Sequence, residues 1–582
     1  MLKRLLKEVK EYKAASILTP ICMILEVVFE TIIPYLMASI IDKGIYGADM
    51  NHVLKIGGLM VLCAIGGLAS GILGGVFGSK ASAGFAKNLR KAMFENIQKF
   101  SFKNIDKFSA SGLVTRLTTD VTNVQNAYQM CLRMAMRAPF SMICALIMAY
   151  YINARITNIY LIAVILLAIA LFFIIRRAME TFRQVFPKYD ALNESVQENV
   201  SAIRVVKAYV REDAEIEKFK NASENIRKIF TKAENNVIIN MPVMMATVYA
   251  CILLISWVGA KMISYGGLTT GELTSLLSYC MNILMSLMML SMVFVMISMS
   301  IASGERIVEV MEEESDIVNP ANPIMEVKDG SIVFDHVDFA YNDTCEEPVL
   351  KDICLNIKSG ETIGIIGATG SAKSSLVNLI SRLYDVDKGS VSLGGVDVRD
   401  YDLVTLRDKV SVVLQKNVLF SGSILDNLRW GDKDATEEDC IRACKQACAH
   451  EFIEKMPEGY NTHIEQGGNN VSGGQKQRLC IARALLKKPK VLILDDSTSA
   501  VDTTTDAKIR KAFNEEIPDT TKIIIAQRIS SVQDADRIIV LDDGRIDAFA
   551  SHDELVANNE IYREIYESQL GGSGDFDEKV GD

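Results

Sequence analysis

This sequence of 582 residues lacks three features: an excess of positive charge, a pairing pattern among its cysteines, and a visible cleavable signal. Its formal net charge is −10, which argues against a general nucleic-acid binder, because such proteins are normally basic. The 12 cysteines are scattered through apolar stretches, as expected of reduced thiols rather than of a disulfide framework. No internal repeat is visible either. These absences argue against a general nucleic-acid binder and against a protein built on disulfides. The remaining information about the fold comes from long hydrophobic runs.

Six uncharged runs in the first half are long enough to cross roughly 30 Å of hydrocarbon, and two carboxylates interrupt only the first of them. Lysines and arginines crowd two long connections, Lys80–Arg137 and Arg176–Glu234, which predicts that these connections are cytosolic and largely helical. Six spans then place both termini in the cytosol. The runs are Ala14–Ile41, Ile56–Ser79, Ala138–Ala154, Ile156–Ile175, Asn235–Ala260 and Leu273–Gly304.

The first thirteen residues, MLKRLLKEVKEYK, predict an amphipathic helix with lysines around an apolar face. Because Glu8 and Glu11 are acidic, the segment does not resemble a mitochondrial transit peptide. We expect this helix to lie in the membrane interface. Its apolar face comprises Leu2, Leu5, Leu6, Val9 and Tyr12.

The second half changes character at about Asp329, where short β-branched runs alternate with helical stretches. This pattern predicts an α/β domain with a largely parallel sheet. We therefore expect a transmembrane domain over 1–304, a linker over 305–328, an α/β domain over 329–570 and a disordered acidic tail over 571–582. The predicted strands are Ser331–Phe334, Thr362–Ile366, Val410–Leu414, Val491–Leu494, Lys522–Ala526 and Arg537–Leu541.

Within this domain, Cys440, Cys444 and Cys448 share one face of an expected helix, with His450 nearby. A metal site is one interpretation of this spacing. Three buried cysteines on a core helix is the simpler alternative.

A phosphate-binding loop follows the strand Thr362–Ile366 and precedes a helix, the context that such a loop requires. Its backbone amides and the helix N-terminus would face phosphates, Lys373 would reach the β- and γ-phosphates, and the Ser374 hydroxyl would bind Mg²⁺. Ala372 occupies the place of the second glycine in the G-x-x-x-x-G-K-[ST] pattern. The candidate loop residues are Gly367, Thr369, Gly370, Ser371, Ala372, Lys373, Ser374 and Ser375.

Two further motifs follow in a specific order: VSGGQKQR (Val471–Arg478) opens a helix, and VLILDDSTSAVD (Val491–Asp502) ends a strand with two aspartates. With the six spans in front, the chain resembles a half-size ABC exporter, a six-helix transmembrane domain followed by an α/β P-loop ATP-binding cassette. The resemblance covers nearly the whole chain. It includes Ser109–Val121 and Asn199–Glu212, which look like the regions beside the two coupling helices of the family.

The resemblance implies a role for each matching position. Tyr341 would stack on adenine, the alternative being strand packing, and Asp495 would hold Mg²⁺ through water. Gln415 would contact both Mg²⁺ and the attacking water. The signature residues and Asp502 would serve an ATP bound to the loop of an opposing subunit. The signature residues are Ser472, Gly473, Gly474 and Gln475.

Three positions depart from the family pattern, and all three belong to one nucleotide site. Asp496 stands where the family has its catalytic glutamate, Gln527 stands where it has a switch histidine, and Ala372 replaces a glycine. The SGGQ motif is intact. The resemblance therefore implies the degenerate half of a heterodimeric bacterial exporter in the plasma membrane, whose non-identical partner carries the glutamate and the histidine. The alternatives are a slow homodimer and an ATP-gated membrane protein that does not pump; an importer fits the domain order less well.

Candidate substrate contacts lie in the first and sixth spans. Glu26 and Glu30 stand one turn apart, and intramembrane carboxylates are functional candidates by default. They would meet a cationic substrate, take up protons or pair with the partner subunit, and a structural role near an aqueous vestibule is the alternative. One helical face of the sixth span carries methionines, which suit varied apolar ligands, although ordinary packing is again the alternative. These features favour export of amphiphilic, cationic, drug-like hydrophobic molecules, with lipids or peptides as alternatives. The methionines are Met281, Met285, Met288, Met292, Met296 and Met299, with Met289 beside them and Met241, Met244 and Met245 in the fifth span.

Overall fold

The computed structural model describes residues 1–341, 347–496 and 503–572. It divides into two compact units, which are described separately below. A helical unit comprises 1–99 and 109–313, and a cassette unit comprises 100–108 and 314–582. The tail expected over 571–582 lies outside the described residues from 573 onward, and Gly571 and Gly572 end a helix.

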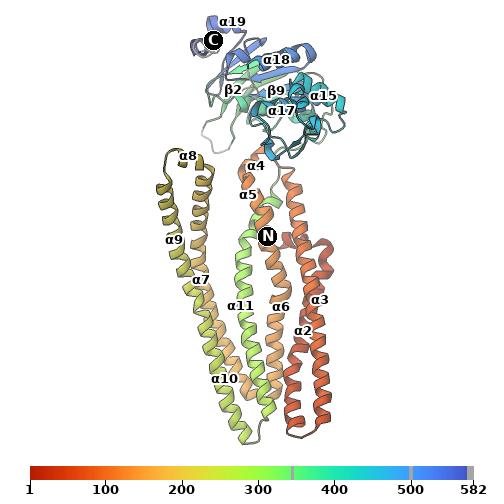
Figure 1. The fold of residues 1–582 in the computed structure, drawn as a ribbon, viewed down its shortest axis with the longest axis vertical. Coiled ribbons are helices and arrows are strands. Elements are labelled where there is room, and N and C mark those ends of the chain that lie inside the picture. Colours follow the sequence, from red (N-terminus) through yellow and green to blue (C-terminus); the bar gives the residue numbers. More distant parts are fainter. Residues whose placement is uncertain (342–346, 497–502, 573–582) are drawn as a thin grey trace. The chain divides into compact units, whose positions relative to one another are not determined.

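The helical unit consists of long helices, as the apolar runs predict (Figure 1). Six helices among the described residues are long and apolar enough to cross a membrane, which confirms the predicted number of spans. Polar caps mark the turns between them: the Asn153 side chain accepts hydrogen bonds from the two amides that open the next helix. The helices are α1 (Leu2–Lys7), α2 (Lys13–Ser39), α3 (Met50–Ile97), α5 (Ala110–Thr115), α6 (Val121–Ile152), α7 (Ala154–Ser201), α8 (Ile203–Ala208), α9 (Glu212–Ile238), α10 (Asn240–Ser264) and α11 (Thr270–Glu312).

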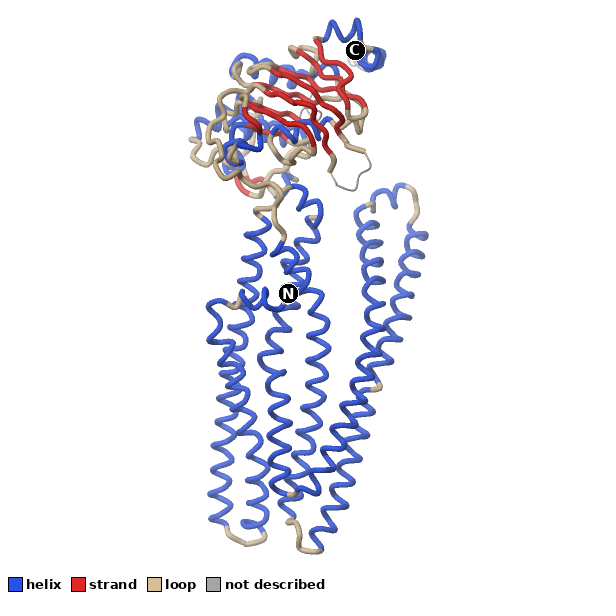
Figure 2. Tube along the Cα trace, turned by 180° about the vertical axis from the view of Figure 1, so that it is seen from behind, coloured by secondary structure: helices blue, strands red, loops and turns tan. Residues whose placement is uncertain are grey.

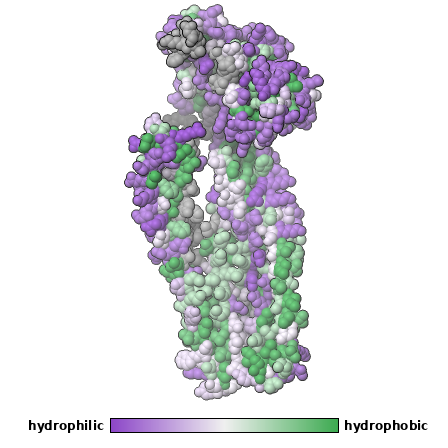
Figure 3. Space-filling view, viewed as in Figure 1, coloured by the Kyte–Doolittle hydropathy of each residue, from purple (hydrophilic) through white to green (hydrophobic). Residues whose placement is uncertain are grey.

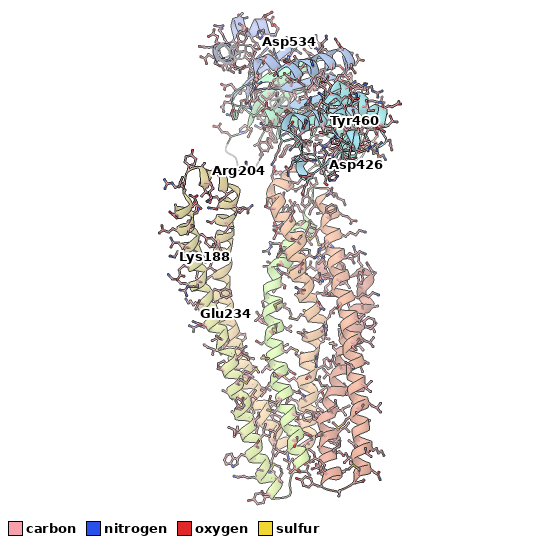
Figure 4. All side chains as sticks on the ribbon, in the orientation of Figure 1. Lys188, Arg204, Glu234, Asp426, Tyr460 and Asp534 are labelled. Carbon is pink, nitrogen blue, oxygen red and sulfur yellow. The ribbon has the colours of Figure 1, made fainter. Side chains whose placement is uncertain are left out.

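Several of these helices run well beyond their apolar runs. At 1.5 Å per residue, the 48 residues of α7 span ~72 Å, more than twice the thickness of a hydrocarbon layer. Charged side chains such as Lys188, Arg204 and Glu234 extend from the continuation of α7, from α8 and from α9 (Figure 4). Hydrophobic residues instead cover the part of the helices far from α8 (Figure 3).

Helix α11 passes through the boundary expected at residue 304 and ends at Glu312, so the first part of the expected linker is helical. Two ion pairs hold this continuation against the turn before α6. Arg306 donates to Asp120 at 2.8 Å, and Arg116 lies 3.0 Å from Glu309. The sequence contains no helix-breaking residue here before Pro320.

The N-terminal helix α1 only partly fits the expected interfacial helix. Leu5 and Val9 are buried in protein contacts, whereas Leu2 and Leu6 are exposed. Glu8 is also buried, and its carboxylate lies 2.8 Å from Arg4 and 2.7 Å from Lys10. Part of the apolar face therefore packs against the rest of the protein, and part of it is exposed.

The cassette unit contains a six-stranded sheet in the order β12-β11-β3-β10-β9-β6, parallel except for the edge strand β12 (Figure 2). A four-stranded antiparallel sheet has the order β2-β1-β4-β5, and β7 pairs with β8. The strands are β1 (Ile332–Phe339), β2 (Leu350–Ile357), β3 (Thr362–Ile366), β4 (Lys388–Leu393), β5 (Val396–Asp397), β6 (Val410–Val413), β7 (Gly422–Ser423), β8 (His463–Ile464), β9 (Val491–Asp495), β10 (Thr521–Ile525), β11 (Arg537–Asp542) and β12 (Arg545–Ala550).

Five of the six predicted runs lie in the six-stranded sheet. The sixth, Ser331–Phe334, belongs instead to β1 of the antiparallel sheet. Strands β9 and β10 are buried along their whole length, as expected for the apolar runs Val491–Leu494 and Ile523–Ile525 within them. Helices pack around these sheets, and they are α12 (Lys373–Ile380), α13 (Leu403–Lys409), α14 (Ile424–Leu428), α15 (Glu437–Gln446), α16 (His450–Glu454), α17 (Gly473–Leu486), α18 (Thr503–Glu516), α19 (His552–Asn558) and α20 (Glu560–Gly572).

Helix α15 corrects the predicted cysteine face. Cys440 and Cys444 are fully buried on it, as the core interpretation requires, but Cys448 lies beyond its end with a φ of 51°. The His450 ring pairs with the Tyr460 hydroxyl at 2.9 Å. The metal interpretation therefore has no helical face to support it.

One short helix from the N-terminal half belongs to the cassette unit. This helix, α4 (Phe102–Phe108), follows α3 in the chain. The Tyr384 hydroxyl donates to Asp106 at 2.9 Å, and the Tyr384 ring lies 6.0 Å from that of Phe102. Helix α4 thus lies next to one of the segments expected near coupling helices, and α5 and α8 are short helices within those segments.

Candidate nucleotide site

The ends of three parallel strands bring the candidate residues together. In the sheet register, Ile525 of β10 pairs with Ile365 of β3 on one side and with Asp495 of β9 on the other. The loop after β3, the aspartates at the end of β9 and Gln527 after β10 therefore meet at one edge. The carboxyl edge of a parallel sheet is where ligands bind in such folds.

The loop between β3 and α12 needs glycine where the backbone is crowded. A side chain at Gly367 would place its first carbon 2.2 Å from the Leu541 carbonyl oxygen, and Gly370 has a φ of 90°. Ala372, the last residue before α12, also has a left-handed backbone, with a φ of 71°. This conformation disfavours a residue with a Cβ by roughly 1–2 kcal/mol relative to the right-handed region. The glycine expected by the pattern is thus replaced at a position whose conformation favours glycine.

The Lys373 ammonium lies inside this loop. It donates to the carbonyl oxygens of Gly367 at 2.8 Å and Ala368 at 2.7 Å. Burial lowers the pKa of Lys373, and the carboxylates of Asp495 and Asp496 partly offset that effect. A cation enclosed by the loop is suited to an anionic ligand.

Asp495 ends the buried strand β9 and faces α12. Burial raises the pKa of its carboxyl group, the neighbouring Asp496 raises it further, and a hydrogen bond from Ser374 together with the Lys373 charge opposes this. A carboxylate and a hydroxyl group are oxygen donors of the kind that Mg²⁺ prefers. The donor set therefore fits the ion that the sequence predicts.

The second aspartate is held by two glutamines. The Gln527 amide donates to the Asp496 carboxylate at 2.9 Å, and the Gln415 amide lies 3.5 Å from the same oxygen. The Asp496 backbone has a φ of 46°, a region that Asp tolerates better than most residues. The two glutamines predicted to be catalytic therefore both contact the third such residue, Asp496.

Sequence reasoning missed a fourth residue of this group, Gln477. It is 2% exposed on α17, and its amide nitrogen lies 3.4 Å from the Asp496 carbonyl oxygen. The quoted motif VSGGQKQR contains this residue. The position of Gln477 after the signature directs its side chain away from the N-terminus of α17 and toward the sheet. This spacing was the signal in the sequence that could have indicated the contact.

Tyr341 has contacts that serve both of its interpretations. Its hydroxyl group is 2.8 Å from Ser375 of α12, and its ring lies 4.9 Å from Phe339 and 5.1 Å from Tyr384. The ring is only half-buried, so part of it remains available for contact.

The signature residues open α17. Ser472 caps the helix: its side chain accepts from the Gln475 amide at 3.3 Å, and the Gln475 side chain accepts from the Ser472 amide at 2.9 Å. Ser472 and Gly473 are exposed, which leaves a helix N-terminus open to an anion. Among the described residues, no hydrogen bond joins the signature to the loop of the same chain. Asp502 lies outside the described residues.

Comparison with known proteins shows to which family a chain with these features belongs. Residues 16–288 match the ABC transporter transmembrane region, and residues 350–499 match the ABC transporter domain. The chain belongs to the ABC transporter family. One membrane region followed by one cassette is the architecture of a half-size exporter, and the cassette makes the chain part of an ATP-hydrolysing transporter.

Curated relatives span the whole chain. An uncharacterized ABC transporter ATP-binding protein of Bacillus subtilis, YfiB, is 37% identical over 98% of this chain and 99% of its own length. A second uncharacterized one, Rv1273c of Mycobacterium tuberculosis, is 35% identical over 99% of this chain and 100% of its own. A solved structure of a bacterial Atm1-family ABC exporter with ATP bound covers 96% of this chain and 99% of its own, with a TM-score of 0.83 and 23% identity. This likeness shows that the fold is that of an exporter.

The candidate substrate residues of this half-transporter lie on several surfaces. Met281, Met285 and Met292 of α11 are exposed on the chain. Met288, Met289 and Met296 are half-buried, and the side chain of Met299 is outside the described residues. In α10, Met244 is buried whereas Met241 and Met245 are exposed. Glu26 and Glu30 of α2 both pair with an arginine of α6.

Proposed function

We propose that this chain is one half of a heterodimeric ABC exporter that moves amphiphilic, drug-like molecules across the bacterial plasma membrane. In this proposal, both termini are cytosolic. The chain binds ATP in its own loop but turns it over slowly. Its signature helix, with Ser472, Gly474 and Asp502, completes a competent site on a non-identical partner that supplies a glutamate and a histidine.

The environment of Asp496 carries this proposal. Aspartate is one methylene shorter than glutamate, which withdraws its carboxylate by roughly 1.5 Å. A displacement of about 1 Å can lower a rate on the order of 10²-fold. The Gln527 amide, 2.9 Å away, also occupies one oxygen of the carboxylate that a general base would offer to water. Glutamine cannot carry the positive charge of a protonated histidine.

Ser374, Asp495 and Gln415 would hold Mg²⁺, which supplies charge neutralisation at the phosphates when bound. The protein groups do the remaining work. Lys373 exchanges its bonds to the loop carbonyls for bonds to phosphate, and the α12 amides bind phosphate oxygens. Tyr341 stacks on the base. Hydrolysis at the partner's loop, assisted by the signature of this chain, then resets the transporter.

The substrate class rests on the exposed methionines of α11. Met281, Met285 and Met292 form a flexible, polarizable surface that adapts to ligands of varied shape. Closure of the two cassettes would turn the membrane cavity outward through the segments around α4 and α8. Membrane lipid surrounds the spans, and no nucleic acid is involved.

Steady-state ATPase activity of this chain alone in lipid nanodiscs tests the proposal, with ATP binding measured in parallel. We expect bound ATP with negligible turnover. Lys373→Ala is the control that removes the binding itself. Rapid turnover that is lost in Asp496→Asn would instead establish a homodimer with an adequate aspartate.

An ATP-gated protein that does not pump is the second candidate. The intact SGGQ motif, capped and exposed, argues against it because it serves hydrolysis in a dimer. Passive conductance opened by a non-hydrolysable ATP analogue would favour this candidate, and substrate flux strictly coupled to turnover would exclude it.

A further inference from the structure

Three charged residues form an ion-pair cluster between two membrane helices. Arg137 of α6 lies 3.2 Å from Glu26 and 2.8 Å from Glu30, the carboxylates of α2. Glu26 is mostly buried, with 18% of its side chain exposed, whereas half of the Glu30 side chain is exposed. One guanidinium therefore bridges two carboxylates, and the cluster taken alone carries one excess negative charge.

A pocket of about 410 Å³ opens beside this cluster, between α2, α3 and α6. Both glutamates line it, and so do small residues of α3, among them Gly67 and Gly71. A side-chain carbon at Gly71 would lie 3.3 Å from the Glu26 carboxyl carbon. The small residues of α3 thus give access to the carboxylates.

A second arginine, Arg133, lines the same pocket one helical turn from Arg137. Its Nε is buried without a hydrogen-bond partner, and within the described part of the chain no carboxylate pairs with it. Its stem packs along α3, where a side-chain carbon at Gly78 would lie 3.2 Å from the Arg133 Cδ. A buried N–H group without a hydrogen-bond partner is costly, so this half-buried arginine has capacity for a ligand.

The cluster lies within the hydrocarbon layer. Glu26 and Gly71 each stand about fifteen residues, or ~22 Å, from the ends of their apolar runs at the α2–α3 turn, and Arg137 stands as far from the end of α6 at Ile152. The layer is about 30 Å thick, so all three residues fall inside it. Charged groups at this depth persist only when they are paired or serve a ligand.

We propose that this pocket binds the polar end of a zwitterionic amphiphile. Its anionic group, a phosphate or a carboxylate, pairs with Arg133, and its ammonium or guanidinium group pairs with the half-exposed Glu30. The alkyl part lies along the apolar residues of α2 and α3. This assignment names a class of ligand for the proposed export function. The interpretation of the pocket as a substrate site rests on that proposed function.

Charge balance favours a zwitterion over a simple ion. Two glutamates and two arginines sum to zero, and a ligand with no net charge keeps that sum. A cation alone would compete with Arg137 for carboxylate and leave Arg133 without an anion. An anion alone would lie near two carboxylates. Either case leaves an uncompensated charge in the apolar layer, which is strongly unfavourable.

Calorimetric binding to the full chain in nanodiscs without nucleotide tests the assignment. The probes are octylphosphocholine, octyltrimethylammonium and octyl phosphate, which share one alkyl chain, and empty nanodiscs provide the blank. We expect octylphosphocholine to bind most tightly. Arg133→Gln and Glu30→Gln should each weaken it about tenfold or more, as for loss of a charge-assisted hydrogen bond. Arg133→Lys should retain most of the affinity, and Arg176→Gln, an exposed arginine elsewhere in the helical unit, should leave it unchanged.

The proposal is wrong if octyltrimethylammonium binds as tightly as octylphosphocholine and Arg133→Gln does not change its affinity. It is also wrong if none of the three probes binds. Comparison of phosphatidylcholine with phosphatidylglycerol nanodiscs separates two sources of the ligand. If octylphosphocholine binds more weakly in phosphatidylcholine nanodiscs, it competes with a lipid headgroup for the pocket. Equal affinity in both kinds of nanodisc assigns the pocket to a free amphiphile. Either result supports a zwitterionic ligand. Since no nucleotide is present, these results are independent of whether the chain hydrolyses ATP.

Discussion

In the proposed function the cassette has two surfaces that face nucleotide, and both are helix N-termini. At α17, Ser472 and Gln475 cap the helix reciprocally before any ligand binds. At α12, no side chain caps the helix, the residue before it is an alanine in a left-handed conformation, and Lys373 bonds to carbonyls of its own loop. The signature surface is therefore preorganised, and the loop surface has to rearrange.

This difference has a simple location in the fold. The altered residues Ala372, Asp496 and Gln527 all lie at the carboxyl edge of the parallel sheet, whereas the signature residues cap a separate helix, α17. Substitutions could accumulate at one surface without disturbing the other. In the proposed function, a single cassette loses catalytic competence in its own site while it keeps the groups that it lends to a partner.

The largest expected effect comes from the preorganised surface. Ser472→Ala should lower ATP turnover of the assembled transporter on the order of 10²-fold, because in the proposed function it removes a hydroxyl that binds the transferred phosphate. Thr436→Ala removes a similar cap from α15 and is the matched control, with an expected loss of only about 1 kcal/mol in stability. Equal losses of turnover in both variants would reduce the role of Ser472 to helix capping.

Restoring the altered surface should have the next largest effect. Asp496→Glu combined with Gln527→His should raise turnover by the chain alone by about 10²-fold, since it extends the carboxylate and returns an ionisable group. Single-turnover hydrolysis of radiolabelled ATP measures this gain. If the double variant is as slow as the natural chain, the defect lies elsewhere than in these two side chains.

A smaller gain is expected at the loop. Ala372→Gly should tighten ATP binding about fivefold, because glycine adopts a positive φ without the cost of a Cβ, a difference of about 1 kcal/mol. Fluorescent nucleotide titration measures the change. Ala368→Gly, in the same loop but without a positive φ, should give no gain, and an equal gain there would point to general loop flexibility.

The smallest expected effect separates the heterodimer from a homodimer. Asp496→Asn should change turnover of the assembled transporter less than about twofold, because hydrolysis proceeds at the partner's loop. Both variants are measured in the same preparation of the transporter. A loss of turnover in Asp496→Asn as large as that in Ser472→Ala would show that Asp496 is the catalytic base.

The sequence was sufficient for most of the cassette. The loop, the acidic strand β9 and the signature each carry their chemistry in consecutive residues, so their local structure was predictable. The strand Ser331–Phe334 was predicted, but its place in the antiparallel sheet was not, because its apolar run alone does not indicate its pairing partner. Cys448 was placed on a helix that ends at Gln446, since helix ends depend on packing that short windows do not reveal.

Contacts between distant segments were not predictable. Glu26 and Glu30 were recognised as unusual, but their pairing with Arg137 joins residues more than a hundred positions apart. The unpartnered Arg133 stood out even less, because it falls in a segment expected to be cytosolic. Gln477 was also invisible as a contact of Asp496, since α17 and β9 meet only in the folded domain.

The assignment of α4 to the cassette unit has a practical consequence for work with the isolated domain. A cassette expressed from residue 314 onward would lack Phe102 and Asp106, which contact Tyr384. The Tyr384 hydroxyl and part of its ring would then face water. Adding a peptide of residues 100–108 in trans should restore solubility and thermal stability to such a fragment, as a missing piece of its own fold would.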